Sequence, residues 1–138
     1  MSVTIVESHE MPIDSEDDII LVRRNVRDLA QTCGFDVFAT SAVTTAASEL
    51  ARNIWVHAGR GIARIEKLSD DDRFGVRVVF KDEGPGIADV ERVLAGGFST
   101  AKSMGLGVSG SRRLVDEFAI ESIVGRGTTV TFVKWTPY

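Results

Sequence analysis

The chain has 138 residues, of which 43% are hydrophobic and 26% are charged. This length and balance fit one domain with its own core, here residues 1–138, and exclude a disordered chain. The formal net charge of −4 argues against a nucleic-acid binder. The apolar runs are too short to span a bilayer, the N-terminus lacks a signal-peptide pattern, and the single cysteine, Cys33, allows no internal disulfide. We therefore expect a cytoplasmic protein that binds neither membrane nor nucleic acid.

The first part of the chain predicts a short strand and two long helices. Residues 3–6 fit a short edge strand. A helix is expected to begin at Asp14-Ser15, because acidic residues follow there in the first turn, and to end at Gly34. A second helix is expected over residues 37–57. The residues expected to be buried are Ile19, Val22, Val26, Leu29 and Cys33 on the first helix, and Val43, Ala46, Ala47, Leu50 and Ile54 on the second.

The second part predicts strands around a glycine-rich region. Residues 62–68 and 74–81 read as strands, and in the second of these Val76, Val78 and Phe80 alternate with more polar positions. The glycine-rich region, residues 82–110, contains an expected short helix at residues 90–94. A helix over about residues 108–118 and a hairpin of residues 120–124 and 128–135 follow. This order predicts an α+β fold whose sheet is covered on one face by helices.

Glu49 and Asn53 are four residues apart on the second helix, so they lie on one face, one turn from each other. A carboxylate and a carboxamide in this arrangement can hold a hard cation and a water through oxygen ligands. The alternative is an ordinary solvated helix face. His57 extends the row by another turn, and we interpret it as a structural residue whose cation suits the C-terminal end of the helix dipole.

Three glycine-containing segments lie in the second half of the chain. Asp82-Glu83-Gly84-Pro85-Gly86-Ile87 ends a strand, where an acid can accept a hydrogen bond from an exocyclic amine; the alternative is a plain turn. Gly105-Leu106-Gly107-Val108 opens a helix, where backbone N–H groups can bind phosphates. Gly125-Arg126-Gly127-Thr128 reads by itself as a hairpin turn. Each signal is weak alone, and no Walker-type phosphate loop is present.

Taken in order, these segments resemble the sequence boxes of the Bergerat ATP-binding fold of the GHKL ATPases and kinases. The closest resemblance is to the RsbT-like serine/threonine switch kinases of bacterial stressosomes. It rests on residues 48–54, on Asp82 with Gly84-Pro85-Gly86-Ile87, on Gly97-Phe98-Ser99-Thr100 and on residues 125–128. It covers the chain from about residue 10 onward. The resemblance implies a Bergerat sandwich with a mixed, mostly antiparallel sheet.

The resemblance also implies roles for individual residues. Glu49 would be the catalytic carboxylate, Asn53 would ligate Mg²⁺, and Asp82 would accept from the adenine amino group with support from Thr128. The nucleotide ATP would be bound further by Gly84, Gly86, Ile87, Gly105, Leu106, Gly107 and Val108. Residues 97–107 would form a short lid over the nucleotide. Lys102 in this lid would either contact the γ-phosphate or remain a solvated lysine.

The implied activity is transfer of the γ-phosphate of Mg-ATP to a Ser or Thr of an STAS-domain protein in a stress-signalling partner switch. A downstream phosphatase or another effector would be the second partner, and a homodimer is left open. The alternative is an anti-sigma-factor type of binding regulator whose ATP site controls docking. Co-purification with an STAS protein or with a sigma factor separates the two interpretations.

Overall fold

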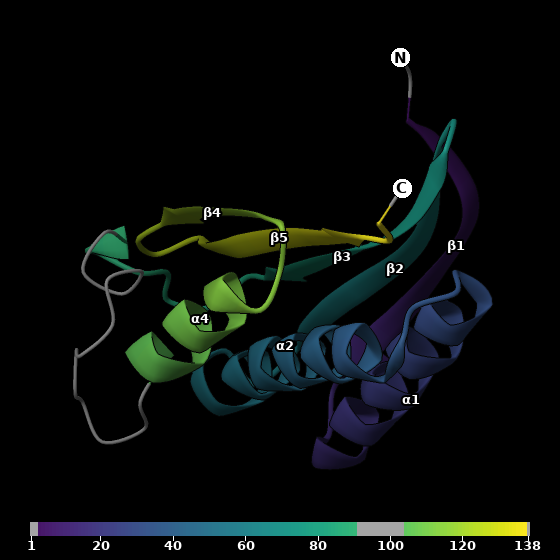
Figure 1. The fold of residues 1–138 in the computed structure, drawn as a ribbon. Coiled ribbons are helices and arrows are strands. Elements are labelled where there is room, and N and C mark those ends of the chain that lie inside the picture. The colour runs from purple at the N-terminus through teal and green to yellow at the C-terminus, as the bar shows by residue number, and fades with distance from the viewer. Residues whose placement is uncertain (1–2, 91–103, 138) are drawn as a thin grey trace.

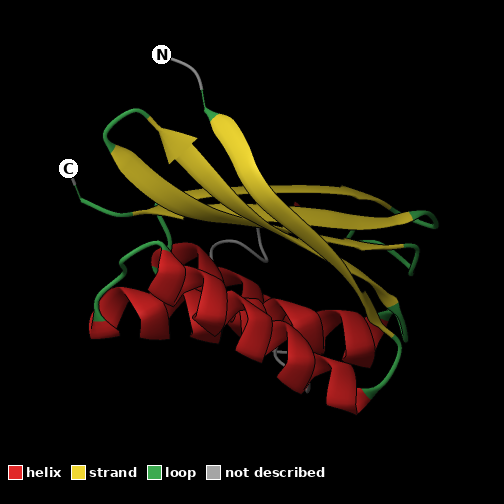
Figure 2. Cartoon of the chain, turned by 90° about the vertical axis from the view of Figure 1, so that its right-hand side faces the viewer, coloured by secondary structure: helices red, strands yellow, loops and turns green. Residues whose placement is uncertain are grey.

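One five-stranded sheet carries all the described helices on one of its faces (Figures 1 and 2). The computed structural model describes residues 3–90 and 104–137. In chain order the elements are β1 (Thr4–Ile13), α1 (Glu16–Thr32), α2 (Val37–His57), β2 (Gly61–Asp70), β3 (Arg73–Asp82), α4 (Met104–Arg113), β4 (Glu117–Ile123) and β5 (Gly127–Trp135). The strand order is β1-β2-β3-β5-β4, and these neighbours all pair antiparallel. The expected α+β sandwich is confirmed.

The two long helices begin and end at the residues that the sequence indicates. In α1 the Asp18 carboxylate accepts from the Ser15 N–H at 3.1 Å, and the helix is followed by Gly34 with φ of +86°. In α2 the Asp36 carboxylate accepts from the Ala39 N–H at 2.8 Å, which satisfies one of the free donors of the first turn. The predicted bounds of α2 are confirmed.

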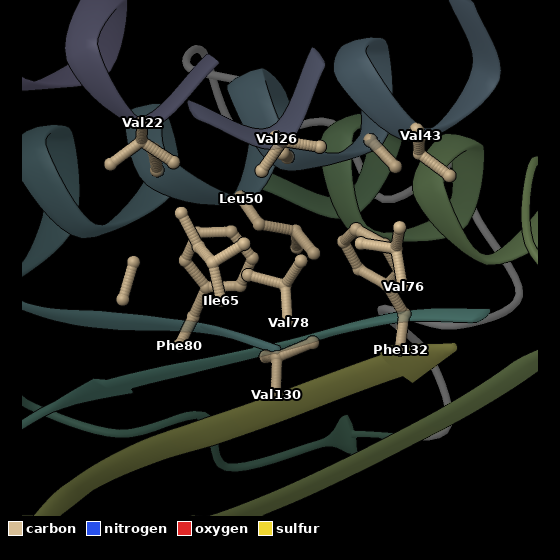
Figure 3. Packing of buried hydrophobic residues seen from close by; sticks show 14 of the residues in the cluster. Val22, Val26, Val43, Leu50, Ile65, Val76, Val78, Phe80, Val130 and Phe132 are labelled. Atoms are coloured by element: carbon tan, nitrogen blue, oxygen red, sulfur yellow. The ribbon is translucent and has the colours of Figure 1, made fainter. Parts of the chain in front are cut away.

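The core lies between the helices and the facing side of the sheet (Figure 3). All ten helix residues predicted to be buried are buried, and so are Val76, Val78 and Phe80 of β3. The rings of Phe80 and Phe132 lie 6.3 Å apart between centroids, in tilted contact. Burial raises the pKa of the Cys33 thiol, which fits a structural cysteine.

Two elements, β1 and the last helix, differ from the prediction by more than three residues at one end or both. β1 has 10 residues rather than about four, because it pairs with β2 from Thr4 to Ile13. Most of its side chains are exposed, so no apolar alternation marks it in the sequence. The last helix begins at Met104 and ends at Arg113, whereas we expected it to reach about Phe118. Phe118 instead pairs with Phe132 in the sheet, where its ring packs on the core.

The expected short helix at residues 90–94 lies outside the described residues, apart from Val90. None of the helices in residues 3–90 and 104–137 combines the length and apolarity that crossing a membrane requires. The C-terminal end of α2, the end of β3, α4 and the β4–β5 turn lie together at the left of Figure 1. This end of the sandwich carries the segments that the sequence singled out.

Candidate functional site

A pocket opens where α2, β3, α4 and the β4–β5 hairpin meet. Six of the residues predicted for the nucleotide site line it, namely Asn53, Asp82, Gly86, Ile87, Val108 and Thr128. The other lining residues are Leu50, Ile54, His57, Ala58, Phe80, Pro85, Ile120 and Val130. Segments up to 80 residues apart in the sequence therefore form one mostly apolar pocket with a few polar groups, the usual character of a small-molecule site.

On α2 the row of polar residues runs into this pocket. Asn53 and His57 both line it, one helical turn apart. The amide nitrogen Nδ2 of Asn53 and the ring nitrogen Nε2 of His57 are buried and have no hydrogen-bond partner among the described residues. Buried polar groups are normally paired, so these two groups leave hydrogen-bonding capacity in the pocket for water or a ligand. Glu49 lies one turn earlier, is partly buried, and does not line the pocket.

The protonation of His57 differs from the cationic state that the sequence suggested. Burial lowers the pKa of His57 below its ordinary value, and the nearby Asp82 carboxylate only partly opposes this shift. The neutral imidazole is therefore favoured at neutral pH. The interpretation of His57 as a cation at the helix end is not supported; its ring lines the pocket, and its Nε2 is buried without a partner among the described residues.

Asp82 is held at the end of β3 by the start of the following loop. Its Oδ1 accepts from the Gly84 N–H at 2.9 Å, which orients the carboxylate. Across the β3–β5 ladder Asp82 is paired with Thr128. A Cβ atom at Gly84 would come within 2.6 Å of the Ala58 Cβ and 3.2 Å of Asp82 Oδ1. The absence of a side chain at Gly84 therefore lets the loop pass close to the end of α2.

Ser122 is a site residue that the sequence did not single out. Its hydroxyl oxygen accepts from the Ile87 N–H at 2.7 Å and lies 2.8 Å from the Thr128 hydroxyl. It also donates toward the Gly127 carbonyl at 3.2 Å. This one side chain thus joins the loop after β3 to the hairpin. A serine in a strand, outside any glycine box, gives no sequence signal for such a role.

The glycines of the loop and the hairpin allow the two segments to approach closely. The Gly125 N–H donates to the Pro85 carbonyl at 2.8 Å. A Cβ at Gly86 would lie 2.5 Å from the Ile123 carbonyl oxygen, and one at Gly127 would lie 2.1 Å from the Asp82 carbonyl oxygen. We expected Gly84 and Gly86 to make room for a flat ligand. At both positions a side chain would collide with other atoms of the protein, so packing within the chain alone explains the glycines.

The glycine segment of residues 105–108 lies within α4 rather than before it. Gly105, Leu106 and Gly107 belong to the first turn of the helix, and the buried Val108 lines the pocket. Glycine is a poor helix former, which is why the sequence suggested a later start. The first N–H groups of a helix remain free for a ligand, so this turn keeps its capacity to bind an anion. Lys102 lies outside the described residues.

The site residues can be tested for their fit to Mg-ATP. The cavity measures about 40 Å³, room for a few waters rather than a purine, so a nucleotide would have to widen it. Within residues 3–90 and 104–137, no group of three or more His, Cys, Asp or Glu side chains is placed to hold a metal. The unpaired atom of Asn53 is its amide nitrogen, a donor suited to a phosphate oxygen, so only its amide oxygen could ligate a metal. A bound Mg²⁺ would therefore take most of its ligands from phosphates and water, as Mg²⁺ commonly does.

Known proteins resemble this chain over most of its length. Residues 13–134 match the family described as histidine kinase-like ATPase domain. The serine/threonine-protein kinase RsbT of Bacillus subtilis (strain 168) is 42% identical over 123 residues, which are 89% of this chain and 92% of that protein. The anti-sigma F factor of Caldanaerobacter subterraneus subsp. tengcongensis is 33% identical over 99 residues, 67% of this chain and 68% of that protein.

Solved structures share the fold at lower identity. The SiaB–SiaC complex from Pseudomonas aeruginosa contains a chain with a TM-score of 0.60 and 15% identity, covering 96% of this chain and 91% of that one. The mycobacterial sensor histidine kinase MprB matches with a TM-score of 0.55 and 17% identity, covering 93% and 95%. These two similarities concern the fold alone. The family match over residues 13–134 and the 42% identity to RsbT establish that the chain belongs to the histidine kinase-like ATPase family, in the group of the serine/threonine-protein kinase RsbT.

Proposed function

We propose that this serine/threonine-protein kinase transfers the γ-phosphate of Mg-ATP to a Ser or Thr of an STAS-domain regulator in a stress-signalling partner switch. The observation that carries the proposal is the convergence of Asn53, Asp82 and Thr128 on one pocket. Asn53 brings an unpaired buried amide to that pocket, and Asp82 brings an oriented carboxylate. The Asn53 amide oxygen could ligate a phosphate-bound cation while its Nδ2 donates to a phosphate, and the Asp82 carboxylate could accept from an amino-substituted base.

The adenine end of the pocket would be formed by Asp82, Thr128 and the apolar wall. The Asp82 carboxylate would accept from the exocyclic amine, a charge-assisted bond that favours adenine over a base with a carbonyl at that position. Leu50, Ile54, Phe80, Ile120 and Val130 supply the apolar surface for the ring. Gly84, Gly86 and Ile87 would pass along the edge of the base.

The phosphate end would lie toward Asn53 and the first turn of α4. Asn53 would ligate Mg²⁺ through its amide oxygen, and the ion would neutralise phosphate charge. Gly105, Leu106, Gly107 and Val108 would offer backbone N–H groups to the phosphates. Lys102 is proposed as a further contact to the γ-phosphate. Glu49, on the same helix row as Asn53, would orient the attacking hydroxyl and accept its proton.

The proposed partners follow from the same family relation. The acceptor would be an STAS-domain protein, and a phosphatase or other effector would bind the kinase after release. The proposed location is the cytoplasm. A second candidate function, an anti-sigma factor whose ATP site controls docking, is favoured by the 33% identity to an anti-sigma F factor over 67% of this chain.

A transfer assay with the purified chain tests the proposal. Labelled ATP, Mg²⁺ and an STAS protein encoded beside this gene are incubated with the wild type and with Glu49→Gln. We expect acid-stable label on a Ser or Thr of the STAS protein with the wild type only, with the residue identified by mass spectrometry. Tight binding to a sigma factor without transfer would favour the second candidate. No ATP binding at all would contradict both.

A further inference from the structure

The two most exposed large apolar side chains in the described part of the chain stand side by side at the start of α2. Val37 is 80% exposed and Phe38 is 84% exposed. Neither is needed to start the helix, because the Asp36 carboxylate caps it through the Ala39 N–H. Single exposed apolar residues are ordinary, but here two follow each other in the chain, and Val37 also lines a groove.

A groove of about 340 Å³ runs between α1 and α2 beside this pair. Arg23, Arg27 and Gln31 line it from α1, and Phe35, Asp36, Val37, Thr40, Ser41, Thr44 and Thr45 line it from the loop and α2. The Thr44 hydroxyl donates to the Thr40 carbonyl at 2.6 Å, and the Thr40 hydroxyl donates to the Phe35 carbonyl at 3.4 Å. Two of the four hydroxyl residues in the lining are thus engaged within the chain, and Arg23 and Arg27 are the cationic residues of the groove.

Basic residues gather at this surface although the chain as a whole is acidic. The chain carries a net charge of −4, yet Arg23, Arg24 and Arg27 fall within one short stretch of α1. Arg27 approaches Asp28 only at 4.0 Å, and no salt bridge joins Arg23 or Arg24 to another residue in the described ranges. The acid within the groove, Asp36, is engaged as the cap of α2. Arg23 and Arg24 are therefore available to an anionic partner, whereas Arg27 lies in salt-bridge range of Asp28.

We propose that the α1–α2 groove, together with Val37 and Phe38, docks an acidic segment of a partner protein that carries a large apolar side chain. The carboxylates of the segment would face Arg23 and Arg27, and its apolar side chain would cover Phe38. The 15 residue steps from Phe38 to Asn53 span roughly 22 Å along α2. A partner bound here leaves the nucleotide pocket open, so the inference goes beyond the transfer reaction and does not depend on it.

A second copy of this chain is a poorer occupant than an acidic segment. In a two-fold dimer through this surface, each copy would present the same patch to the other. Arg23 and Arg27 of one copy would then face mainly the same arginines and neutral hydroxyls of its partner, and Asp36 is the one carboxylate among the lining residues, where it already caps α2. Like charges across a contact are unfavourable, so charge complementarity selects a different protein with acidic residues.

Binding of defined peptides tests the proposal directly. The first probe is a fluorescein-labelled amphipathic peptide with Leu on one helical face and Glu on both flanks of that face. The second has Lys in place of every Glu. By fluorescence anisotropy at low salt, we expect the wild type to bind the Glu peptide at least tenfold more tightly. Equal affinities, or no binding of the Glu peptide, would overturn the proposal.

Three variants assign the binding to this surface. Phe38→Ser should weaken binding of the Glu peptide at least tenfold without changing the circular dichroism spectrum. Arg23→Glu combined with Arg27→Glu should reverse the preference toward the Lys peptide. Val56→Ser is the matched control, because Val56 is an exposed apolar residue of α2 outside the groove. An equal loss with Val56→Ser, or an unchanged preference in the double arginine variant, would contradict the assignment.

A photo-crosslinking amino acid at position 38 tests the natural partner in cells. The cross-linked peptide is sequenced by mass spectrometry. We expect a segment of another protein with net negative charge and at least one large apolar residue. A cross-link to this chain itself, a neutral or basic segment, or no cross-linked product would count against the proposal. Because neither readout uses ATP, a negative result here is distinguishable from failure of the kinase assay.

Discussion

Asp82 and Thr128 lie opposite each other in the β3–β5 ladder, where both line the pocket. The Thr128 hydroxyl lies 2.8 Å from the Ser122 hydroxyl, which in turn accepts from the Ile87 N–H. The carboxylate is thereby placed beside a connected set of hydroxyl groups and a fixed loop. This relationship makes Asp82 the most direct test of the nucleotide site.

We expect Asp82→Asn to abolish measurable ATP binding and to leave the fold intact. The amide is a weaker acceptor than the carboxylate and can turn its NH₂ toward the amino group of the base. The fold should persist, because an amide oxygen can still accept from the Gly84 N–H. Calorimetric titration measures the affinity, and Glu83→Gln, next in the chain and exposed, is the control. Wild-type affinity in Asp82→Asn would refute this role.

Gly127→Ala should destabilise the protein far more than Gly125→Ala. At Gly127, φ is +137° and an added Cβ would lie 2.1 Å from the Asp82 carbonyl oxygen. Backbone strain and overpacking together suggest a loss of roughly 3–5 kcal/mol in the free energy of unfolding. At Gly125, φ is +82° and the surrounding space is open, so a loss of about 1–2 kcal/mol is expected. Urea unfolding of both variants checks the difference, and equal losses would contradict the close approach.

Much of the fold could be predicted because its helices carry local signals. The apolar residues of α1 recur with the period of a helix, and Val76, Val78 and Phe80 alternate with the period of a strand, so each pattern fits one type of secondary structure. β1 could not be bounded in this way, since an edge strand with mostly exposed side chains has no such period. The end of α4 was also wrong, because Phe118 is drawn into the sheet by pairing with Phe132, a contact that local sequence does not encode.

The site could be predicted where short segments, each weak alone, occur in an order that resembles a known family. Asn53 and Asp82 stood out by their spacing and by the glycines that follow Asp82, and the structure brings both to one pocket. Ser122 and the neutral state of His57 could not be predicted in the same way. Each depends on burial and on neighbours from other elements, which exist only after the strands have paired.

The pocket histidine should make stability fall on acidification. Because the pKa of His57 is lowered in the folded state, the unfolded chain binds a proton first as the pH drops. The free energy of unfolding should therefore decrease below about pH 6.5 and level off once the pH passes below the folded-state pKa. His57→Gln should remove this part of the pH dependence. Urea unfolding between pH 5 and pH 8 gives the difference, and parallel curves for the two proteins would contradict it.

The proposed switch predicts that the acceptor protein binds more tightly before phosphorylation than after it. A phosphate adds roughly −1.5 to −2 charges to the acceptor, and this chain is itself acidic with a net charge of −4. We expect at least a tenfold difference in affinity, which corresponds to about 1.4 kcal/mol. Surface plasmon resonance with both forms and a non-hydrolysable ATP analogue measures it. Equal affinities would argue for the anti-sigma type of regulator.

The positions of Glu49 and Asn53 predict different defects when each is changed. Asn53 lines the pocket and has an unpaired buried amide atom, whereas Glu49 lies one turn earlier and outside the lining. Asn53→Ala should weaken Mg-ATP binding, because a group that would ligate the cation is lost. Glu49→Gln should retain ATP affinity and lower kcat by on the order of 100-fold or more, because it would act on the attacking hydroxyl.

Titration calorimetry with Mg-ATP and a steady-state transfer assay separate these two defects. Asn53→Asp is the informative companion variant, since a carboxylate can still ligate Mg²⁺ but adds negative charge beside the phosphates. We expect it to bind Mg-ATP better than Asn53→Ala and worse than the wild type. If Glu49→Gln and Asn53→Ala shared one binding defect and one turnover, the division of roles along α2 would be wrong. The helix would then present both residues to the same part of the nucleotide.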